Sequence, residues 1–233
     1  MSDWISFYDF KHSVIYVNAR HRDVHYDTIA RDIRAYVPSP DARVMDYGCG
    51  EATSADLVAA VSGQLILVEA APNVRAALKA RYQGHPKISV LTPEEALAMA
   101  DGSLDLIVMH SVAQYLTSAE LERLLAQFRR LTRPTGMLVI GDVVPPHFAA
   151  PAAALALLRF AAAHGFFWAA LLGLARIFVS DYVRLKRRIG LAHYTEAQML
   201  ARLAAAGFDA HRATTNIGHN QRRMTFLARP ASR

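Results

Sequence analysis

Cysteine is nearly absent from this chain, which excludes one way of stabilising a fold. Cys49 is the single cysteine among 233 residues, so no disulfide can form within the chain. The first residues also lack the basic and then apolar run of a signal peptide, because Asp3, Trp4 and Asp9 stand there instead. We therefore expect a cytoplasmic protein that is held together by an apolar core.

A long uninterrupted apolar run is missing as well. Residues 148–172 are rich in Ala, Leu and aromatic side chains, but Arg159, His164 and Gly165 interrupt them. The uninterrupted stretches are shorter than the roughly 20 apolar residues of a membrane-spanning helix. Because 53% of the 233 residues are hydrophobic, the chain can bury one sizeable core, and no internal repeat divides it.

The most informative stretch that is present is residues 44–53, with the sequence Val-Met-Asp-Tyr-Gly-Cys-Gly-Glu-Ala-Thr. An apolar run ends in Asp46 and a glycine-spaced turn, which is typical of a nucleotide-binding loop. Gly48 and Gly50 let the backbone turn sharply and approach a ligand closely. A dinucleotide fingerprint needs a third glycine where Thr53 stands, so a nicotinamide or flavin cofactor is disfavoured.

An acid follows the second apolar run at the position that suits a ribose. Glu69 ends the run 65–68, close to the roughly 20-residue offset at which doubly wound folds place such a carboxylate. Further apolar runs at 88–91, 104–109 and 137–140 predict three more strands, the last after a turn at 134–136. An amphipathic helix is predicted over residues 22–37.

These motifs resemble those of the class I S-adenosylmethionine-dependent methyltransferases. Asp46, Gly48 and Gly50 match the first motif of that family, an acid followed by Gly-x-Gly-x-Gly, with Ala52 in place of the third glycine. Residues 104–108 look like its fourth motif, and residues 133–140 look like its turn into strand five, with Thr135 in place of a usual glycine. Residues 205–208 and 224–228 resemble its last helix exit and final strand.

The resemblance covers roughly residues 41–145 and 193–229 and implies an α/β fold. We expect a Rossmann-like doubly wound sheet, mostly parallel with an antiparallel last strand, plus a helical insertion after strand five. The expected single domain comprises an N-terminal arm or lid (1–40), a cofactor-binding core (41–146), a helical insertion or cap (147–192), and a C-terminal helix and strands (193–233). Within the arm, residues 7–18 could fold over a pocket or simply cover a core edge.

S-adenosylmethionine is the cofactor that the resemblance implies. Asp46 is expected to fix the turn and the amino-acid end of the cofactor, and Glu69 to accept hydrogen bonds from both ribose hydroxyls. Glu94 or Glu95 would contact the adenine amino group, although Thr92 and Glu95 also form a helix-capping pattern. The expected cofactor-binding residues are Asp46, Gly48, Cys49, Gly50, Glu69, Ala70, Glu94, Glu95 and His110.

Two residues are candidates for a catalytic base. His110 follows strand four at the carboxyl end of the sheet, where open parallel sheets bind ligands, and Tyr194 follows the insertion. No metal site is expected, because the ten histidines are scattered and the pair His21 and His25 has no obvious third ligand.

The insertion 147–192 is where we expect acceptor selection. It could serve as a lid, as a dimer interface or, together with the basic residues at 184–188, as a peripheral membrane contact through 147–188. We expect a small-molecule or lipid-like, partly apolar acceptor. The net charge of +6 keeps a nucleic-acid methyltransferase as the alternative, but the Asn/Asp-Pro-Pro-aromatic motif of many base-directed enzymes is missing. A protein that only binds the cofactor is the remaining alternative, and the oligomeric state is open.

Overall fold

A computed structural model describes residues 5, 9, 16–146, 150–177 and 191–232. Its seven-stranded sheet has the order β3-β2-β1-β4-β5-β7-β6. The pairs among β1 to β5 are parallel, whereas β7 pairs antiparallel with β5 and with β6. The expected doubly wound sheet with an antiparallel last strand is confirmed.

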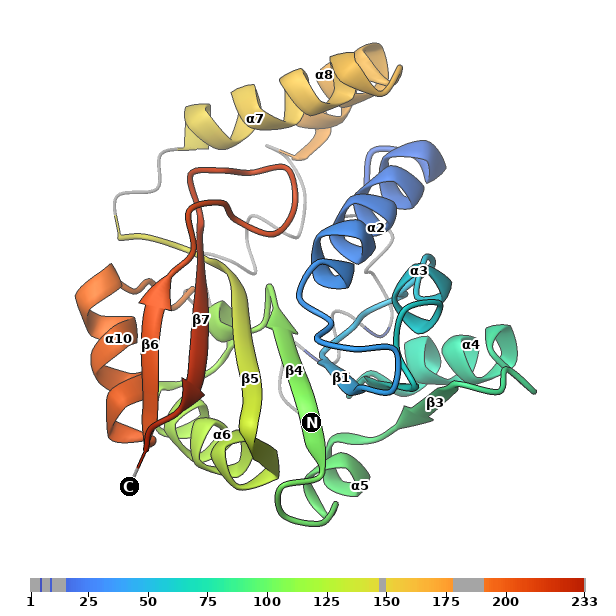
Figure 1. Ribbon diagram of the computed structural model, residues 1–233. Helices are drawn as coiled ribbons and strands as arrows, with labels where there is room; N and C mark the ends of the chain where they lie inside the picture. The colour runs from blue at the N-terminus through green and yellow to red at the C-terminus, as the bar shows by residue number, and fades with distance from the viewer. Residues whose placement is uncertain (1–4, 6–8, 10–15, 147–149, 178–190, 233) are drawn as a thin grey trace.

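The bounds of the elements follow the predicted alternation closely (Figure 1). The strands are β1 (Arg43–Tyr47), β2 (Gln64–Val68), β3 (Ile88–Leu91), β4 (Leu104–His110), β5 (Thr132–Val143), β6 (Phe208–Arg212) and β7 (Met224–Pro230). The described helices are α2 (Ala19–Arg34), α3 (Asp56–Ala59), α4 (Pro72–Arg81), α5 (Pro93–Leu97), the 3-10 turn η2 (Ala113–Tyr115), α6 (Ser118–Leu131), α7 (Ala150–Ala163), α8 (Phe167–Ile177) and α10 (Glu196–Ala205).

Helices cover both faces of the sheet, because neighbouring apolar residues of each central strand point to opposite sides. On one face Met45 and Ile107 pack with α6 and α10, and on the other Val44 and Leu106 pack with α2, α3 and α4. The two apolar clusters bury both faces of β1 and β4. The carboxyl ends of these strands are therefore held rigidly at one edge of the sheet.

Strand five departs from the prediction. The sequence predicts a turn at 134–136 before a short strand, but β5 already begins at Thr132 and runs through Pro134 and Gly136. The extra residues are accommodated by a register shift, since Leu104 pairs with Thr132 whereas Leu106 pairs with Met137. Pro134 cannot donate a ladder hydrogen bond, so the turn-like sequence produces an irregularity within a strand.

The helical insertion after β5 forms a hairpin, which we call the cap, made of α7 and α8. Gly165 lies between the two helices with φ +75°, a conformation that favours glycine. Phe160 and Phe166 pack together there with Val17 and Val24 from the segment around α2. Figure 1 shows the cap lying beyond the carboxyl end of β4, on the same side as the start of α2. The basic residues 184–188 lie outside the described residues.

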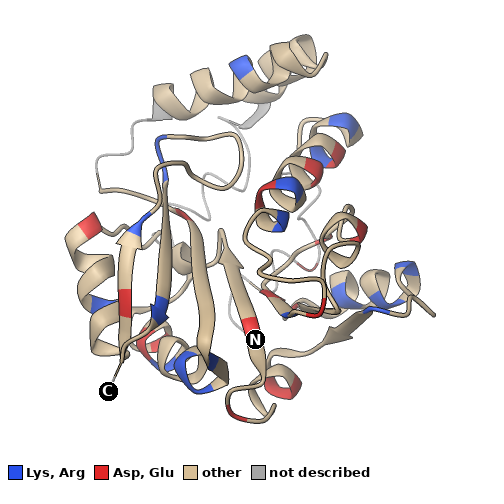
Figure 2. Cartoon of the chain, in the orientation of Figure 1, with Lys and Arg blue, Asp and Glu red and all other residues tan. Residues whose placement is uncertain are grey.

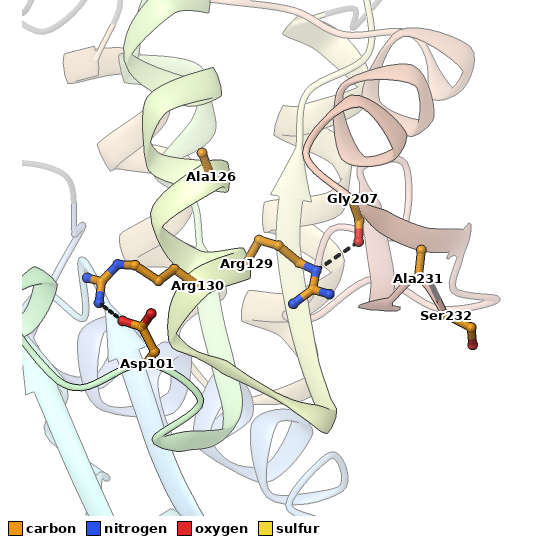
Figure 3. A pocket seen from close by; sticks show the side chains of 7 residues that line it. All are labelled: Asp101, Ala126, Arg129, Arg130, Gly207, Ala231 and Ser232. Carbon is orange, nitrogen blue, oxygen red and sulfur yellow. Dashed lines mark hydrogen bonds and ion pairs between the residues drawn. The ribbon is translucent and has the colours of Figure 1, made fainter.

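A shallow hollow at the other end of the sheet is unrelated to the cofactor loop. Figure 3 shows Arg130 paired with Asp101 and Arg129 donating to the carbonyl of Gly207, where α6 and the last strands meet. It lies at the amino ends of β4 and β5. Open parallel sheets bind their ligands at the opposite edge.

Candidate active site

The loop between β1 and α3 is tied to the end of β2 by backbone hydrogen bonds. The amides of Gly48 and Cys49 both donate to the carbonyl of Val68, at 2.8 and 3.1 Å. The amide of Gly50 donates to a carboxylate oxygen of Glu69 at 2.9 Å. The two segments singled out in the sequence therefore form one unit at the carboxyl edge of the sheet.

Both glycines of this loop are required by their backbone conformation and by their neighbours. Gly48 and Gly50 have φ values of +76° and +61°. A Cβ at Gly48 would overlap Val112, and one at Gly50 would lie 2.6 Å from the Tyr26 hydroxyl oxygen. Larger side chains would thus strain the backbone and also fill the space beside the loop.

Two carboxyl groups face this loop with little positive charge nearby. Burial, and then the charge of Glu69, raises the pKa of Asp46 to about 7. Burial also raises the pKa of Glu69, although its oxygens accept hydrogen bonds from the amides of Gly50 and Ala71. Each of these oxygens retains a second lone pair. The pair therefore suits a ligand that brings a cationic group and hydroxyl donors.

The other predicted cofactor residues border the same region. Ala70 follows Glu69 directly, and Cys49 is buried in the loop, where burial raises the pKa of its thiol. Glu95 forms a capping box with Thr92, so its carboxylate is engaged by a backbone amide at 2.7 Å. Glu94 is exposed at the start of α5, and its charge contributes to raising the pKa of Tyr47 to about 12, after burial as the main cause.

His110 lies at the last position of β4 and is buried. Its Nδ1 has no hydrogen-bond partner among the described residues, and it faces Gly141, where a Cβ would lie 2.8 Å away. Burial lowers the pKa of this imidazole. His110 therefore presents an unpartnered ring nitrogen at the carboxyl edge of the sheet, beside Ser111, whose hydroxyl donates to Asp142 at 2.5 Å.

Tyr194, the other candidate base, lies in a different environment. Its ring belongs to the apolar cluster formed with α6 and α10, and the Arg202 guanidinium lies over it at 5.1 Å. Its buried hydroxyl has no hydrogen-bond partner within the described part of the chain. Burial raises the pKa of this phenol. The structure thus does not bring Tyr194 and His110 into one cluster.

The sequence indicates that segment 7–18 could cover a pocket, but it does not single out the residues that contact the loop region. The Tyr26 hydroxyl accepts a hydrogen bond from the amide of Glu51 at 2.8 Å and another from the Tyr16 hydroxyl at 3.1 Å. Asp9 accepts from the backbone and side-chain nitrogens of Asn73, at 2.6 and 2.9 Å. The only feature of the sequence that distinguishes Asp9 is that it is an acid between two aromatic residues. The periodicity of residues 22–37 predicts that Tyr26 lies on the apolar face of its helix, but it does not predict the contact with the loop.

A layer of histidines and aromatic rings separates the loop region from the cap. His219, in the connection between β6 and β7, stacks on Phe160 of α7 with ring centroids 4.6 Å apart. It also lies 6.2 Å from His25 of α2, and the neighbouring Gly218 lies beside His110. Burial lowers the pKa of His25 and of His219. This layer therefore carries little positive charge at neutral pH.

A cavity of about 570 Å³ opens on the other side of His219. Its wall from α7 is formed by Ala152, Leu155, Ala156, Arg159 and Phe160, and the facing wall by Thr28, His164, His219, Asn220, Gln221 and Arg222. The volume lies in the range of small-molecule sites. The cavity is thus one histidine layer from the carboxyl end of β4.

Neither a metal site nor a membrane span is found in the ranges that the structure describes. No group of three or more His, Cys, Asp or Glu side chains there could hold a metal ion, and the rings of His21 and His25 are 6.1 Å apart. None of the described helices combines the length and apolar character needed to cross a bilayer.

Comparison with known proteins agrees with this geometry. Residues 45–140 match the family model described as a methyltransferase domain. A probable S-adenosylmethionine-dependent methyltransferase of Mycobacterium tuberculosis (strain ATCC 25618 / H37Rv) is 32% identical over 98 residues, which span 42% of this chain and 34% of the relative. The match thus spans about a third of that relative's length.

Solved structures show the same fold. Magnesium protoporphyrin IX methyltransferase from Synechocystis PCC 6803, with bound SAH, superposes with a TM-score of 0.61 at 14% identity, covering 97% of this chain and 96% of that one. The DhpI-SAH complex gives a TM-score of 0.61 at 11% identity, covering 98% and 96%.

The protein is of the doubly wound α/β class, and its glycine loop and Glu69 lie at the carboxyl edge of the sheet, where open sheets of this class bind ligands. The matched residues 45–140 contain this loop, Glu69 and the whole of β4. Residues 45–140 thus match a methyltransferase domain, and the chain shares the fold of solved methyltransferase structures.

Proposed function

We propose that this protein transfers a methyl group from S-adenosylmethionine to a small-molecule or lipid-like, partly apolar acceptor. The observation that carries the proposal is the cavity of about 570 Å³ beneath α7, which has an apolar wall and lies next to the carboxyl edge of the sheet. Methyl transfer needs the acceptor atom in direct contact with the methyl group, so an acceptor held in this cavity must extend past His219 towards the loop.

The residues of the loop fit the cofactor. The left-handed conformations of Gly48 and Gly50 give the loop its sharp turn, and Asp46 offers a carboxylate for the ammonium of the amino-acid end. Glu69 would accept from the ribose hydroxyls with the lone pairs that Gly50 and Ala71 do not use. Bound S-adenosylmethionine would supply an activated methyl group, and Glu94, whose neighbour Glu95 is engaged in a capping box, is the candidate for the adenine amino group.

The chain's remaining task is to orient the acceptor and to receive its proton. His110 has an unpartnered Nδ1 and, because burial lowers its pKa, stays neutral at pH 7 and can accept a proton from an acceptor hydroxyl. We assign this role to His110 before Tyr194, whose ring packs under Arg202. Asp9 and Tyr16 fasten the N-terminal segment beside the loop, which supports its role as a lid.

Two alternatives make different demands on the site. A nucleic-acid acceptor needs a groove in which basic and aromatic residues alternate over several nucleotides. The cavity instead presents Ala152, Leu155 and Ala156, and α7 has Arg159 as its one charged residue (Figure 2). A protein that only binds the cofactor needs no acceptor cavity.

Calorimetric titration with S-adenosylmethionine and S-adenosylhomocysteine, with NAD as control, tests the cofactor. Glu69→Ala should weaken binding by roughly 1.5–3 kcal/mol, because hydrogen bonds to a charged group are lost. Glu69→Gln keeps one acceptor oxygen, so its affinity for the cofactor should lie between those of wild type and Glu69→Ala. Transfer of a radiolabelled methyl group to apolar acids, phenols, quinones or lipids then tests the enzyme. Tight cofactor binding without transfer to any acceptor would favour the non-catalytic alternative.

A further inference from the structure

The cavity beneath α7 has two chemically different walls. Along α7, the lining residues 152, 155, 156, 159 and 160 follow the spacing of one helix face, and all but Arg159 are apolar. The facing wall is polar, with Thr28 of α2, His164, and residues 219–222 of the connection between β6 and β7. A ligand that fills the cavity therefore meets hydrocarbon on one side and hydrogen-bonding groups on the other.

The charged residues that line the cavity are both positive. Arg159 and Arg222 both line it, and no Asp or Glu is among its lining residues. Neither arginine takes part in the ion pairs formed between described residues. Acids in neighbouring segments are engaged by other groups: Asp142 pairs with Arg223, Asp32 accepts from the amide of Gly218 at 2.7 Å, and Asp27 pairs with Arg31.

We propose that this cavity binds an acceptor with an apolar body and an anionic group, a carboxylate or a phosphate, which Arg159 and Arg222 hold. The assignment rests on the proposed function, since it identifies the cavity as the acceptor site. Guanidinium groups bind such anions through paired N–H donors, and two of them at one cavity favour an acid over a neutral compound of the same shape. The face of α7 then packs along the apolar body, up to Phe160 and His219.

Decanoate, decan-1-ol and decyltrimethylammonium are suitable probes, because they share an apolar chain and differ in charge. Each is titrated calorimetrically below its micelle concentration, with and without saturating S-adenosylhomocysteine. Decanoate should bind at least tenfold more tightly than the alcohol, and the cation should bind most weakly. Equal binding of acid and alcohol, or no binding of decanoate, would overturn the proposal.

Substitutions distinguish anion binding by Arg159 and Arg222 from a general effect of the positive charge of the protein. Arg159→Gln combined with Arg222→Gln should weaken decanoate binding at least tenfold and leave decan-1-ol unchanged. Arg34→Gln, an exposed arginine of α2 that does not line the cavity, should leave both unchanged. Ala156→Trp should block both probes by filling the cavity. Unaltered decanoate binding in the double variant would also overturn the assignment.

The affinity for S-adenosylhomocysteine, measured on the same samples, distinguishes the two proposals. It should be the same in wild type and in all these variants, because the substituted residues lie away from the cofactor loop. If the cofactor fails to bind wild type, the proposed function fails. If it binds normally but the preference for the acid is absent, only the anionic acceptor is rejected.

Discussion

At the scale of single residues, the site stands out by two buried carboxyl groups whose pKa values are raised. Burial is the main cause for both; the charge of Glu69 adds to the shift of the Asp46 pKa, whereas backbone amides and Arg75 counteract the shift of the Glu69 pKa. Such an arrangement weakens the folded chain, and it persists where a ligand makes use of it. A cationic ligand group beside Asp46 would remove the conflict.

The raised pKa of Asp46 predicts a pH dependence with a definite sign. This pKa is about 7 in the folded chain, whereas the ordinary value is 3.8, so folding favours the protonated form and stability falls as pH rises between these values. Binding of an ammonium group needs the ionised form. Affinity for S-adenosylhomocysteine should therefore rise from pH 6 to pH 8, measured by calorimetry.

Asp46→Asn is the matching variant. It should bind S-adenosylhomocysteine at least tenfold more weakly at pH 8, lose the pH dependence, and unfold at a higher temperature than wild type at that pH. A gain of 1 kcal/mol corresponds to roughly 2–4 °C for a chain of this size. Asp209→Asn, on exposed β6, is the control. Affinity that does not change with pH would contradict the role of Asp46.

Gly50 allows backbone strain to be separated from crowding. Gly50→Ala adds a Cβ at φ +61° and 2.6 Å from the Tyr26 hydroxyl, whereas Gly84→Ala adds one at φ +75° with nothing within 4 Å. The control should cost about 1–2 kcal/mol of unfolding free energy from strain. Gly50→Ala should cost a further 1–3 kcal/mol, approximately, from overlap. Urea unfolding measures both.

Tyr26→Phe completes a double-mutant cycle with Gly50→Ala. Removing the hydroxyl relieves the overlap but also removes the acceptor for the amide of Glu51. The double variant Gly50→Ala, Tyr26→Phe should therefore be less destabilised than the sum of the single changes. Strict additivity would show that the predicted overlap is not the cause.

At the scale of elements, capping boxes fix where several helices begin. Thr117 accepts from the amide of Glu120, and the Glu120 carboxylate accepts from the amide of Thr117 at 2.8 Å. The helix that follows buries Leu121, Leu125 and Phe128 against the sheet. Loss of the N-terminal cap of α6 should thus reduce the stability of the whole core.

Thr117→Ala tests this contribution. It should lower the free energy of unfolding by about 0.5–2 kcal/mol, the usual value of an N-cap. Thr214→Ala, at an exposed position outside helices and strands, should have little effect. Thermal or urea unfolding of both variants provides the comparison. Equal stability of the two variants would mean that the capping box is replaced by water.

Elements are predictable where a short pattern determines them. The runs 65–68 and 104–109 are largely apolar because both faces of the inner strands β2 and β4 are buried, and these runs and 88–91 at the sheet edge each form a strand within one residue of the expected bounds. The predicted start of β5 is wrong, because pairing with β4 keeps Pro134 and Gly136 in the strand in spite of their local preference. Strand pairing is a contact between distant residues, which local patterns do not contain.

At the scale of the whole molecule, the same limit applies to the site. The loop and Glu69 can be identified from the sequence because glycine spacing and strand ends are local signals. Tyr26 reaches Gly50, and His219 reaches Phe160, only after the chain has folded. The facing walls of the cavity come from segments far apart in sequence, and no spacing rule connects them.

The cap belongs to a packing unit that is smaller than the two clusters of the sheet. Phe160, Ala161, Phe166 and Ala170 form its buried part, while Trp168 and Leu172 of α8 are 73% and 64% exposed. Few buried apolar contacts mean a low free energy of local opening. The cap should therefore open without unfolding of the sheet.

Hydrogen exchange measured by mass spectrometry tests this separation. Amides of α7 and α8 should exchange with a smaller protection free energy than those of β4 and β5, which lie between the two large clusters. Phe166→Ala removes a ring stacked on His21 with centroids 5.1 Å apart and should accelerate exchange in the cap alone. Phe128→Ala, in the core under α6, should instead lower protection throughout the molecule, because it reduces the free energy of global unfolding by about 3–5 kcal/mol. Equal acceleration of cap and sheet by Phe166→Ala would show that the cap unfolds only together with the whole domain.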